Sequence, residues 1–165
     1  MPEKATLERA QRDKEEGKSP STQAAEFVRE EFDHIRSGKH GARNTKQAIA
    51  IGLSKARRAG VELPPPKSGT SSSRVRKQAE RDYEKGQSGA GTSPKRSTAR
   101  ERALKREPRS AASHRAISKQ AKQAASRRSS ASRSAAAEKA VRTKGAGGLR
   151  RAARKAASTR QRNAA

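Results

Sequence analysis

The sequence predicts an all-α protein, in which a small, marginal three-helix module at the N-terminus is followed by a largely disordered, helix-prone basic tail. Hydrophobic residues make up 29% of the chain and aromatic residues 2%, so the chain cannot bury enough apolar surface to order its whole length. Three N-terminal segments have the periodicity of amphipathic helices. Most of the excess positive charge lies beyond the three prolines at 64–66.

Each of the three predicted helices ends at a glycine, which favours helix C-termini because it adopts positive φ at little cost. The helices and their glycines are residues 4–16 with Gly17, residues 20–37 with Gly38, and residues 45–59 with Gly60. Ser19 before Pro20 is typical of an N-cap followed by proline at the first helical position. Asn44, with Gln47 three residues on, resembles a capping box.

An apolar stripe runs along each of the second and third helices. The stripes consist of Ala24, Phe27 or Val28, Phe32 and Ile35 in one helix, and Ala48 or Ile49, Leu53 and Ala56 in the other. We expect the stripes to face each other and to form a core together with Leu7, Val61 and Leu63. A core of so few side chains predicts low stability.

The sequence divides into four segments: a helical module (1–63), a Pro/Gly/Ser linker (64–73), a degenerate partial repeat (74–107) and an Ala/Ser/Arg/Lys-rich basic tail (108–165).

Residues 10–17, Ala-Gln-Arg-Asp-Lys-Glu-Glu-Gly, recur as Ala-Glu-Arg-Asp-Tyr-Glu-Lys-Gly in residues 79–86. The second copy keeps the charge, but few large apolar residues follow it, so we expect no core there. In the tail we expect fluctuating helices, separated by glycines at 145–148, that become ordered on a polyanion.

The charge of the chain predicts a polyanionic partner. The formal net charge is +25; residues 1–66 carry +3 (13 Lys and Arg, 10 Asp and Glu) and residues 67–165 carry +22 (28 and 6). Basic residues separated by Ala and Ser can reach phosphates and release counterions. The candidate nucleic-acid-binding residues of this region are Lys95, Arg96, Lys105, Arg106, Arg115, Lys119, Lys122, Arg127, Arg128, Arg133, Arg142, Lys144, Arg150, Arg151, Arg154 and Lys155. The alternative is a solubilising tail without a partner.

The third predicted helix offers a second set of candidates in a unit of helix–turn–helix size. Its basic residues, which lie around the apolar stripe, are Lys46, Lys55, Arg57 and Arg58. The helix before it carries an acidic face of Glu26, Glu30, Glu31 and Asp33, which would repel DNA at close range. We therefore favour a protein-contacting or solvated role for that face over insertion into a groove.

The sequence offers no pattern of a catalytic or metal-binding site, so we expect no enzymatic activity, no cofactor and no metal. Cysteine is absent, and His34, His40 and His114 stand in no ligand spacing with one another. Gly17-Lys18-Ser19 ends like a phosphate-binding loop, but Arg12 stands where that motif needs its first glycine. The N-terminus lacks the apolar core of a signal peptide, and the longest apolar run is residues 48–53, so we expect no membrane association.

The sequence resembles known proteins in two regions, the N-terminal module and the tail. Residues 18–24, Lys-Ser-Pro-Ser-Thr-Gln-Ala, and residues 38–60, from Gly-Lys-His-Gly-Ala-Arg-Asn-Thr-Lys-Gln onward, resemble an uncharacterised family of small basic bacterial proteins that are labelled DNA-binding or of unknown function. That resemblance covers residues 1–66, implies a bacterial cytoplasmic setting and supplies no catalytic residue. The tail is similar in composition to linker-histone tails, and Ser93-Pro94-Lys95-Arg96 resembles their Ser-Pro-basic-basic element.

These observations together predict a sequence-tolerant DNA-binding protein of the architectural, histone-like or nucleoid-associated kind, which acts in the bacterial cytoplasm by neutralising phosphates. Composition does not separate DNA from RNA, so an RNA- or ribosome-associated protein remains an alternative. A third hypothesis is an adaptor whose residues 19–63 contact a protein partner or a second copy of the chain.

Overall fold

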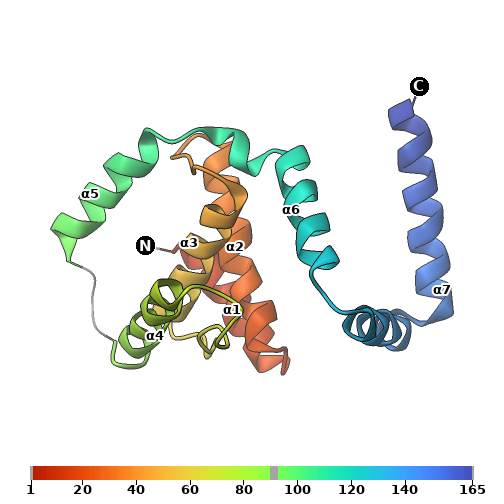
Figure 1. Cartoon of the computed structure of the whole chain (residues 1–165), viewed down its shortest axis with the longest axis horizontal. Helices are drawn as coiled ribbons and strands as arrows, with labels where there is room; N and C mark the ends of the chain where they lie inside the picture. Colours follow the sequence, from red (N-terminus) through yellow and green to blue (C-terminus); the bar gives the residue numbers. More distant parts are fainter. Residues whose placement is uncertain (1, 90–92, 165) are drawn as a thin grey trace. The chain divides into compact units, whose positions relative to one another are not determined.

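The computed structural model describes residues 2–89 and 93–164, and side chains up to residue 162. Within these residues the chain is all-helical, as predicted, and contains no strand. It divides into two compact units, residues 1–120 and 121–165. The helices, coloured along the chain in Figure 1, are α1 (Lys4–Glu15), α2 (Pro20–Arg36), α3 (Thr45–Arg58), α4 (Ser73–Gln87), α5 (Pro94–Lys105), the 3₁₀ helix η1 (Arg109–Ala112), α6 (His114–Ser126) and α7 (Ser130–Ala164).

The three predicted N-terminal helices are confirmed as α1, α2 and α3, each ending one residue before its predicted end. Positive φ angles follow them at Gly17 (69°), Gly38 (81°) and Gly60 (87°). The cap of α3 is also confirmed, since Asn44 Oδ1 accepts a hydrogen bond from the Gln47 backbone N–H at 2.9 Å. Ser19 occupies the N-cap position of α2 but makes no side-chain cap.

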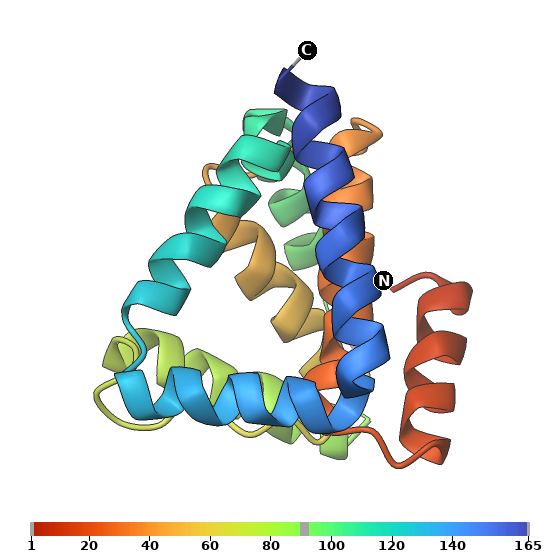
Figure 2. The ribbon, with the colours of Figure 1, turned by 90° about the vertical axis from the view of Figure 1, so that its right-hand side faces the viewer.

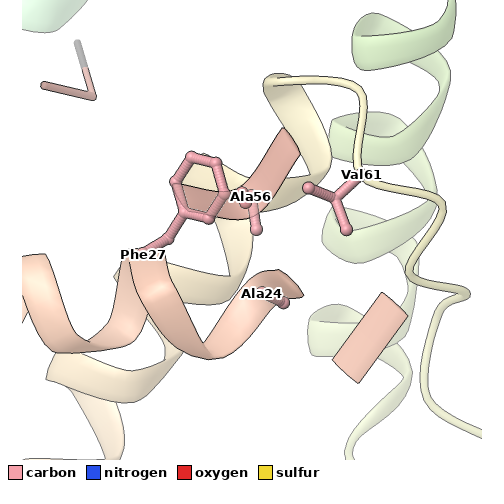
Figure 3. Close-up of a cluster of buried hydrophobic side chains, with 5 residues drawn as sticks. Ala24, Phe27, Ala56 and Val61 are labelled. Atoms are coloured by element: carbon pink, nitrogen blue, oxygen red, sulfur yellow. The ribbon is translucent and has the colours of Figure 1, made fainter. Parts of the chain in front are cut away.

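Helices α2 and α3 pack through their apolar stripes, as predicted. Phe27 is completely buried and packs with Ala24, Ala56 and Val61, as Figure 3 shows. The two backbones approach closely at Gly52, where a Cβ would lie 2.6 Å from the Cα of Val28. The glycine therefore sets the distance between the helices. Leu7, which was expected in the core, is 41% exposed on α1.

A second apolar cluster joins the α2–α3 pair to a segment that the sequence assigned to the tail. Ala111 and Ala112 of η1 are buried in one cluster with Ile35, Ala42 and Ala48. The hydroxyl of Thr45 donates a buried hydrogen bond to the Ala111 carbonyl at 2.8 Å. The Ala42 N–H donates to the Pro108 carbonyl at 3.0 Å. The packed region thus extends well beyond residue 63.

Helix α4 carries the second copy of the repeat and packs against α3. Ala79 and its counterpart Ala10 are equally buried, at 5% exposure each. A Cβ at Gly86 would overlap the carbonyl oxygen of Arg57, so the end of α4 lies directly against the end of α3. The prediction that no core follows the second copy agrees with α5, none of whose residues is buried. Helix α4 itself nevertheless packs against α3, through small residues rather than large apolar ones.

The predicted disorder of the tail is also wrong, since α5, α6 and α7 are helical over most of residues 94–164. Helix α7 changes direction at Gly145, whose φ of 63° and ψ of 169° are not helical. Figure 2 shows its two segments meeting at a sharp corner. This corner lies at the start of the predicted glycine break. None of the described helices is long and apolar enough to cross a membrane.

Candidate nucleic-acid interface

Lys55, one of the four candidates on α3, is directed into the protein. Its ammonium nitrogen lies 2.7 Å from Glu31 Oε2 and 3.3 Å from Glu30 Oε1, and both of these carboxylate side chains are buried. Such a cation balances charge inside the helical unit and is not available to a phosphate. The acidic face of α2 is correspondingly not solvated at these two residues, contrary to expectation.

Arg57 and Arg58 are also held by intramolecular partners. The Arg57 guanidinium is buried, donates to the carbonyl oxygens of Leu63 and Pro64 at 3.1 and 3.3 Å, and has a pKa lowered by that burial. Arg58 binds Asp82 of α4, with Nη2 2.7 Å from Oδ1. Of the α3 candidates only Lys46 is exposed.

Asp82 is the centre of the contact between α3 and α4. It is 1% exposed and accepts hydrogen bonds from Ser54 at 2.7 Å, Arg58 at 2.7 Å and Gln78 at 3.0 Å. Burial alone would raise the pKa of the Asp82 carboxyl, but these hydrogen bonds and the charge of Arg58 outweigh it and leave the pKa below its ordinary value. The predicted DNA contact at Arg58 is therefore a structural ion pair.

The tail candidates have the opposite environment. All of them are exposed. Within the described residues, only Lys105 has a carboxylate partner, Glu101, at 2.9 Å, and this cation lowers the pKa of the Glu101 carboxyl. The exposed candidates are Lys95, Arg96, Lys105, Arg106, Arg115, Lys119, Lys122, Arg127, Arg128, Arg133, Arg142, Lys144, Arg150, Arg151, Arg154 and Lys155.

The segment of α7 after Gly145 gathers most of its cations on one face, and Arg160 is the one that falls on the opposite side. Because an α-helix turns by about 100° per residue, four of its basic residues fall within an arc of about 140°: Arg150, Arg151, Arg154 and Lys155. Leu149, Ala152, Ala153 and Ala156 fall on the opposite side. A continuous basic face of this kind follows a phosphate backbone more readily than scattered charges.

Sequence reasoning missed two groups of residues. Five more exposed cations lie on the tail helices, and the same composition would have identified them: Arg100, Arg102, Lys139, Arg160 and Arg162. The second group is Glu31, His34 and His40, whose potential ligand atoms all lie within 4.8 Å of one another. Their sequence spacing gave no indication of this, since the turn after α2 brings His40 back to the helix.

The comparison with protein families gives one result. The profile of a family of unknown function (DUF6496) matches residues 13–68, which include α2, α3 and the proline segment. The matched stretch overlaps the region that resembles an uncharacterised family. No curated protein and no solved structure matches the chain.

Proposed function

We propose that this protein binds duplex DNA in a sequence-tolerant manner through the exposed cations of α5, α6 and α7, and acts as an architectural, nucleoid-associated factor in a bacterial cytoplasm. The proposal is supported mainly by the difference between the tail cations and the α3 cations in the number of carboxylates near them. The tail cations are exposed with almost no carboxylates nearby, whereas the cations of α3 are largely occupied within the helical unit.

The physical driving force is the release of counterions from the phosphate backbone. Each phosphate that a Lys or Arg neutralises contributes about 0.9 to the slope of log K against log[salt] for duplex DNA. The tail helices carry Ala and Ser between their cations, so their backbones can approach the phosphates. Few aromatic side chains are present for stacking on unpaired bases. This composition supports duplex binding over single-strand binding.

The N-terminal unit contributes little to DNA binding, because most of its α3 cations hold the fold together. Three of the four α3 candidates serve folding, so α3 is not proposed as a reader of base edges. Lys46 remains as a peripheral phosphate contact. The packed unit supplies a folded domain to which the tail is covalently joined.

The test is a competition assay with duplex DNA, duplex RNA and single-stranded DNA of equal length at one salt concentration. We expect the full chain to prefer duplex DNA over single strands and to bind unrelated duplex sequences with similar affinity. A preference for RNA of tenfold or more, about 1.4 kcal/mol, would overturn the proposal in favour of the RNA-associated alternative. Strong preference for one duplex sequence would contradict the sequence-tolerant mode.

A further inference from the structure

Glu31, His34 and His40 form a compact group of metal-ligand side chains at the turn between α2 and α3. One potential ligand atom from each residue lies within 4.8 Å of the other two. All three side chains are largely enclosed, with exposures of 0%, 13% and 12%. This group belongs neither to the tail cations nor to the Asp82 network.

The hydrogen bond made by His40 fixes which of its nitrogens faces Glu31. His40 Nδ1 lies 3.0 Å from the Gly41 carbonyl oxygen, which only accepts, so Nδ1 carries a proton. In the neutral ring Nε2 is then an unprotonated lone-pair donor, and it lies 3.2 Å from Glu31 Oε1. Two electron-rich atoms at this distance repel each other unless a proton or a metal cation lies between them. A backbone carbonyl bound to the outer nitrogen is also the arrangement that orients histidine ligands of metals.

The buried carboxylate of Glu31 also points to a bound cation. Both of its carboxylate oxygens are buried and neither has a hydrogen-bond partner among the described residues. Lys55 Nζ lies 2.7 Å from Oε2 and offsets the charge without hydrogen-bond geometry. Oε1 faces His40 Nε2 at 3.2 Å. A buried carboxylate oxygen without a hydrogen bond is costly, and coordination of a cation is one way to satisfy it.

We infer that Glu31, His34 and His40 bind a divalent transition metal, with zinc as the ion that this donor set suits best. Two imidazoles and one carboxylate are a common zinc ligand set, with metal–ligand distances of about 2.0–2.2 Å. In a tetrahedral site these distances place ligand atoms about 3.4 Å apart. The 3.2 Å separation of His40 and Glu31 fits that spacing.

The surrounding charges can accommodate the ion. Glu3 Oε1 lies 2.8 Å from His34 Nε2 and 2.6 Å from Lys39 Nζ, contacts that lower the pKa of the Glu3 carboxyl to about 2. Glu30 and Lys55 are paired nearby. The carboxylates of Glu3, Glu30 and Glu31 outnumber the ammonium groups of Lys39 and Lys55. A bound cation would therefore offset the remaining negative charge. Glu3 is half exposed, and it or a water occupies the fourth position.

Such a metal would join α2 to the turn after it, would also join the N-terminal segment where Glu3 is the fourth ligand, and would stabilise the small core. Metal binding to the folded state raises its stability in proportion to the ion concentration over the dissociation constant. We expect the melting temperature of the metal-free full chain to rise by several degrees when Zn²⁺ is added.

The experiment uses the untagged full chain after dialysis against a chelator. Zn²⁺ is titrated in competition with a chromophoric chelator, and Co²⁺ is added separately to look for the visible absorption of a tetrahedral site. We expect one ion per chain, and a loss of affinity of at least about tenfold in His34→Ala, His40→Ala and Glu31→Gln. His114→Ala is the matched control, because His114 is exposed at the start of α6, and it should bind as the wild type does.

A second measurement needs no variant in the cluster and so does not depend on the variants folding. The imidazole nitrogen resonances of the full chain are recorded with and without one equivalent of Zn²⁺, with His114→Ala used for assignment. We expect His34 and His40 to shift and His114 to stay unchanged. The proposal is overturned if the wild type shows no saturable binding, if all three histidines shift together, or if a folded double variant of His34 and His40 binds as tightly as the wild type.

Discussion

The region of α1 to α4 and the region of α5 to α7 are both rich in Lys and Arg, but they differ in what neutralises those charges. Residues 1–89 contain 19 Lys and Arg and 13 Asp and Glu, whereas residues 90–165 contain 22 and 3. Ion pairs follow this division. In the part of the first region that the structure describes (2–89), nine Lys and Arg side chains lie within 4.0 Å of a carboxylate: Lys4, Arg9, Lys14, Lys18, Arg36, Lys39, Lys55, Arg58 and Arg76. Among the described residues of the second region only Lys105 does.

This difference teaches that a basic residue in this chain has one of two roles. Cations such as Lys55 and Arg58, whose partners are buried, hold helices together. Cations on α6 and α7 are exposed to solvent and have no carboxylate partner among the described residues, so a phosphate that binds them releases counterions. Stability and nucleic-acid affinity should therefore respond to changes in different parts of the chain.

The largest expected effect is that of deleting residues 121–165, which removes 13 Lys and Arg and one Glu. We expect the affinity for duplex DNA at low salt to fall by at least about 100-fold, because 13 of the 22 Lys and Arg of residues 90–165 are lost. The cooperative unfolding of α1–α4 should persist. Gel-shift titration and circular dichroism measure the two properties. Affinity within about threefold of the full chain would place binding within residues 1–120 and contradict the assignment of most binding to the cations of residues 121–165.

Phe27→Ala should have the largest effect on stability. The ring is completely buried between α2 and α3, and truncating such a side chain costs about 3–5 kcal/mol. Urea denaturation followed by circular dichroism gives the free energy of unfolding. The control is Val75→Ala, because Val75 is 50% exposed on α4 and should change stability by less than about 0.5 kcal/mol. Similar values for the two variants would mean that α2 and α3 do not pack as described.

Asp82→Asn should lower stability by about 2 kcal/mol, since it leaves the partly buried Arg58 without its charge partner. DNA affinity should not change at temperatures where the variant is folded. Glu80→Gln is the matched control on the same helix, because Glu80 makes only an exposed ion pair with Arg76 and such pairs contribute little. If Asp82→Asn weakened DNA binding without affecting stability, Arg58 would belong to the interface.

A smaller effect is expected on the pH dependence of stability. The pKa of the Asp82 carboxyl is lower in the folded protein than in the unfolded chain, so the unfolded state binds the proton more readily. The stabilisation by Asp82 is present above the unfolded pKa of about 3.9 and is lost as the pH falls through the folded pKa. Melting temperatures measured between pH 5 and pH 2 should fall more steeply for the wild type than for Asp82→Asn. Parallel curves would contradict the assignment.

The sequence predicted the three N-terminal helices because their signals are local. Glycine at the C-terminus and the Asn44 cap act within one or two turns of the helix they bound. The packing of η1 and α4 could not be predicted in this way. Ala111, Ala112 and Ala79 contribute little apolar area, and they pack only because backbones approach closely at Gly41 and Gly86. No periodicity in the sequence encodes such an approach.

The binding residues, like the fold, could be predicted from the sequence only where long-range packing plays no part. The tail cations were identified from composition, which suffices where each side chain faces solvent. The basic residues of α3 have the same composition, but their availability depends on acidic residues that are distant in sequence. Glu31 lies 24 residues before Lys55, and Asp82 lies 24 residues after Arg58. Only the packing of α2 and α4 against α3 shows that these cations are occupied.

The most direct test compares two variants of equal net charge in the salt dependence of duplex DNA binding. One carries four substitutions by Gln on α7, at Arg150, Arg151, Arg154 and Lys155. The other carries four at ion-paired cations that are exposed or half-buried, Lys4, Lys14, Lys18 and Arg76. If unpaired tail cations bind the phosphates, the slope of log K against log[salt] should become shallower by about 3.6 in the first variant and by less than about 1 in the second. Equal changes in the two variants would contradict the account, because only net charge would then determine binding.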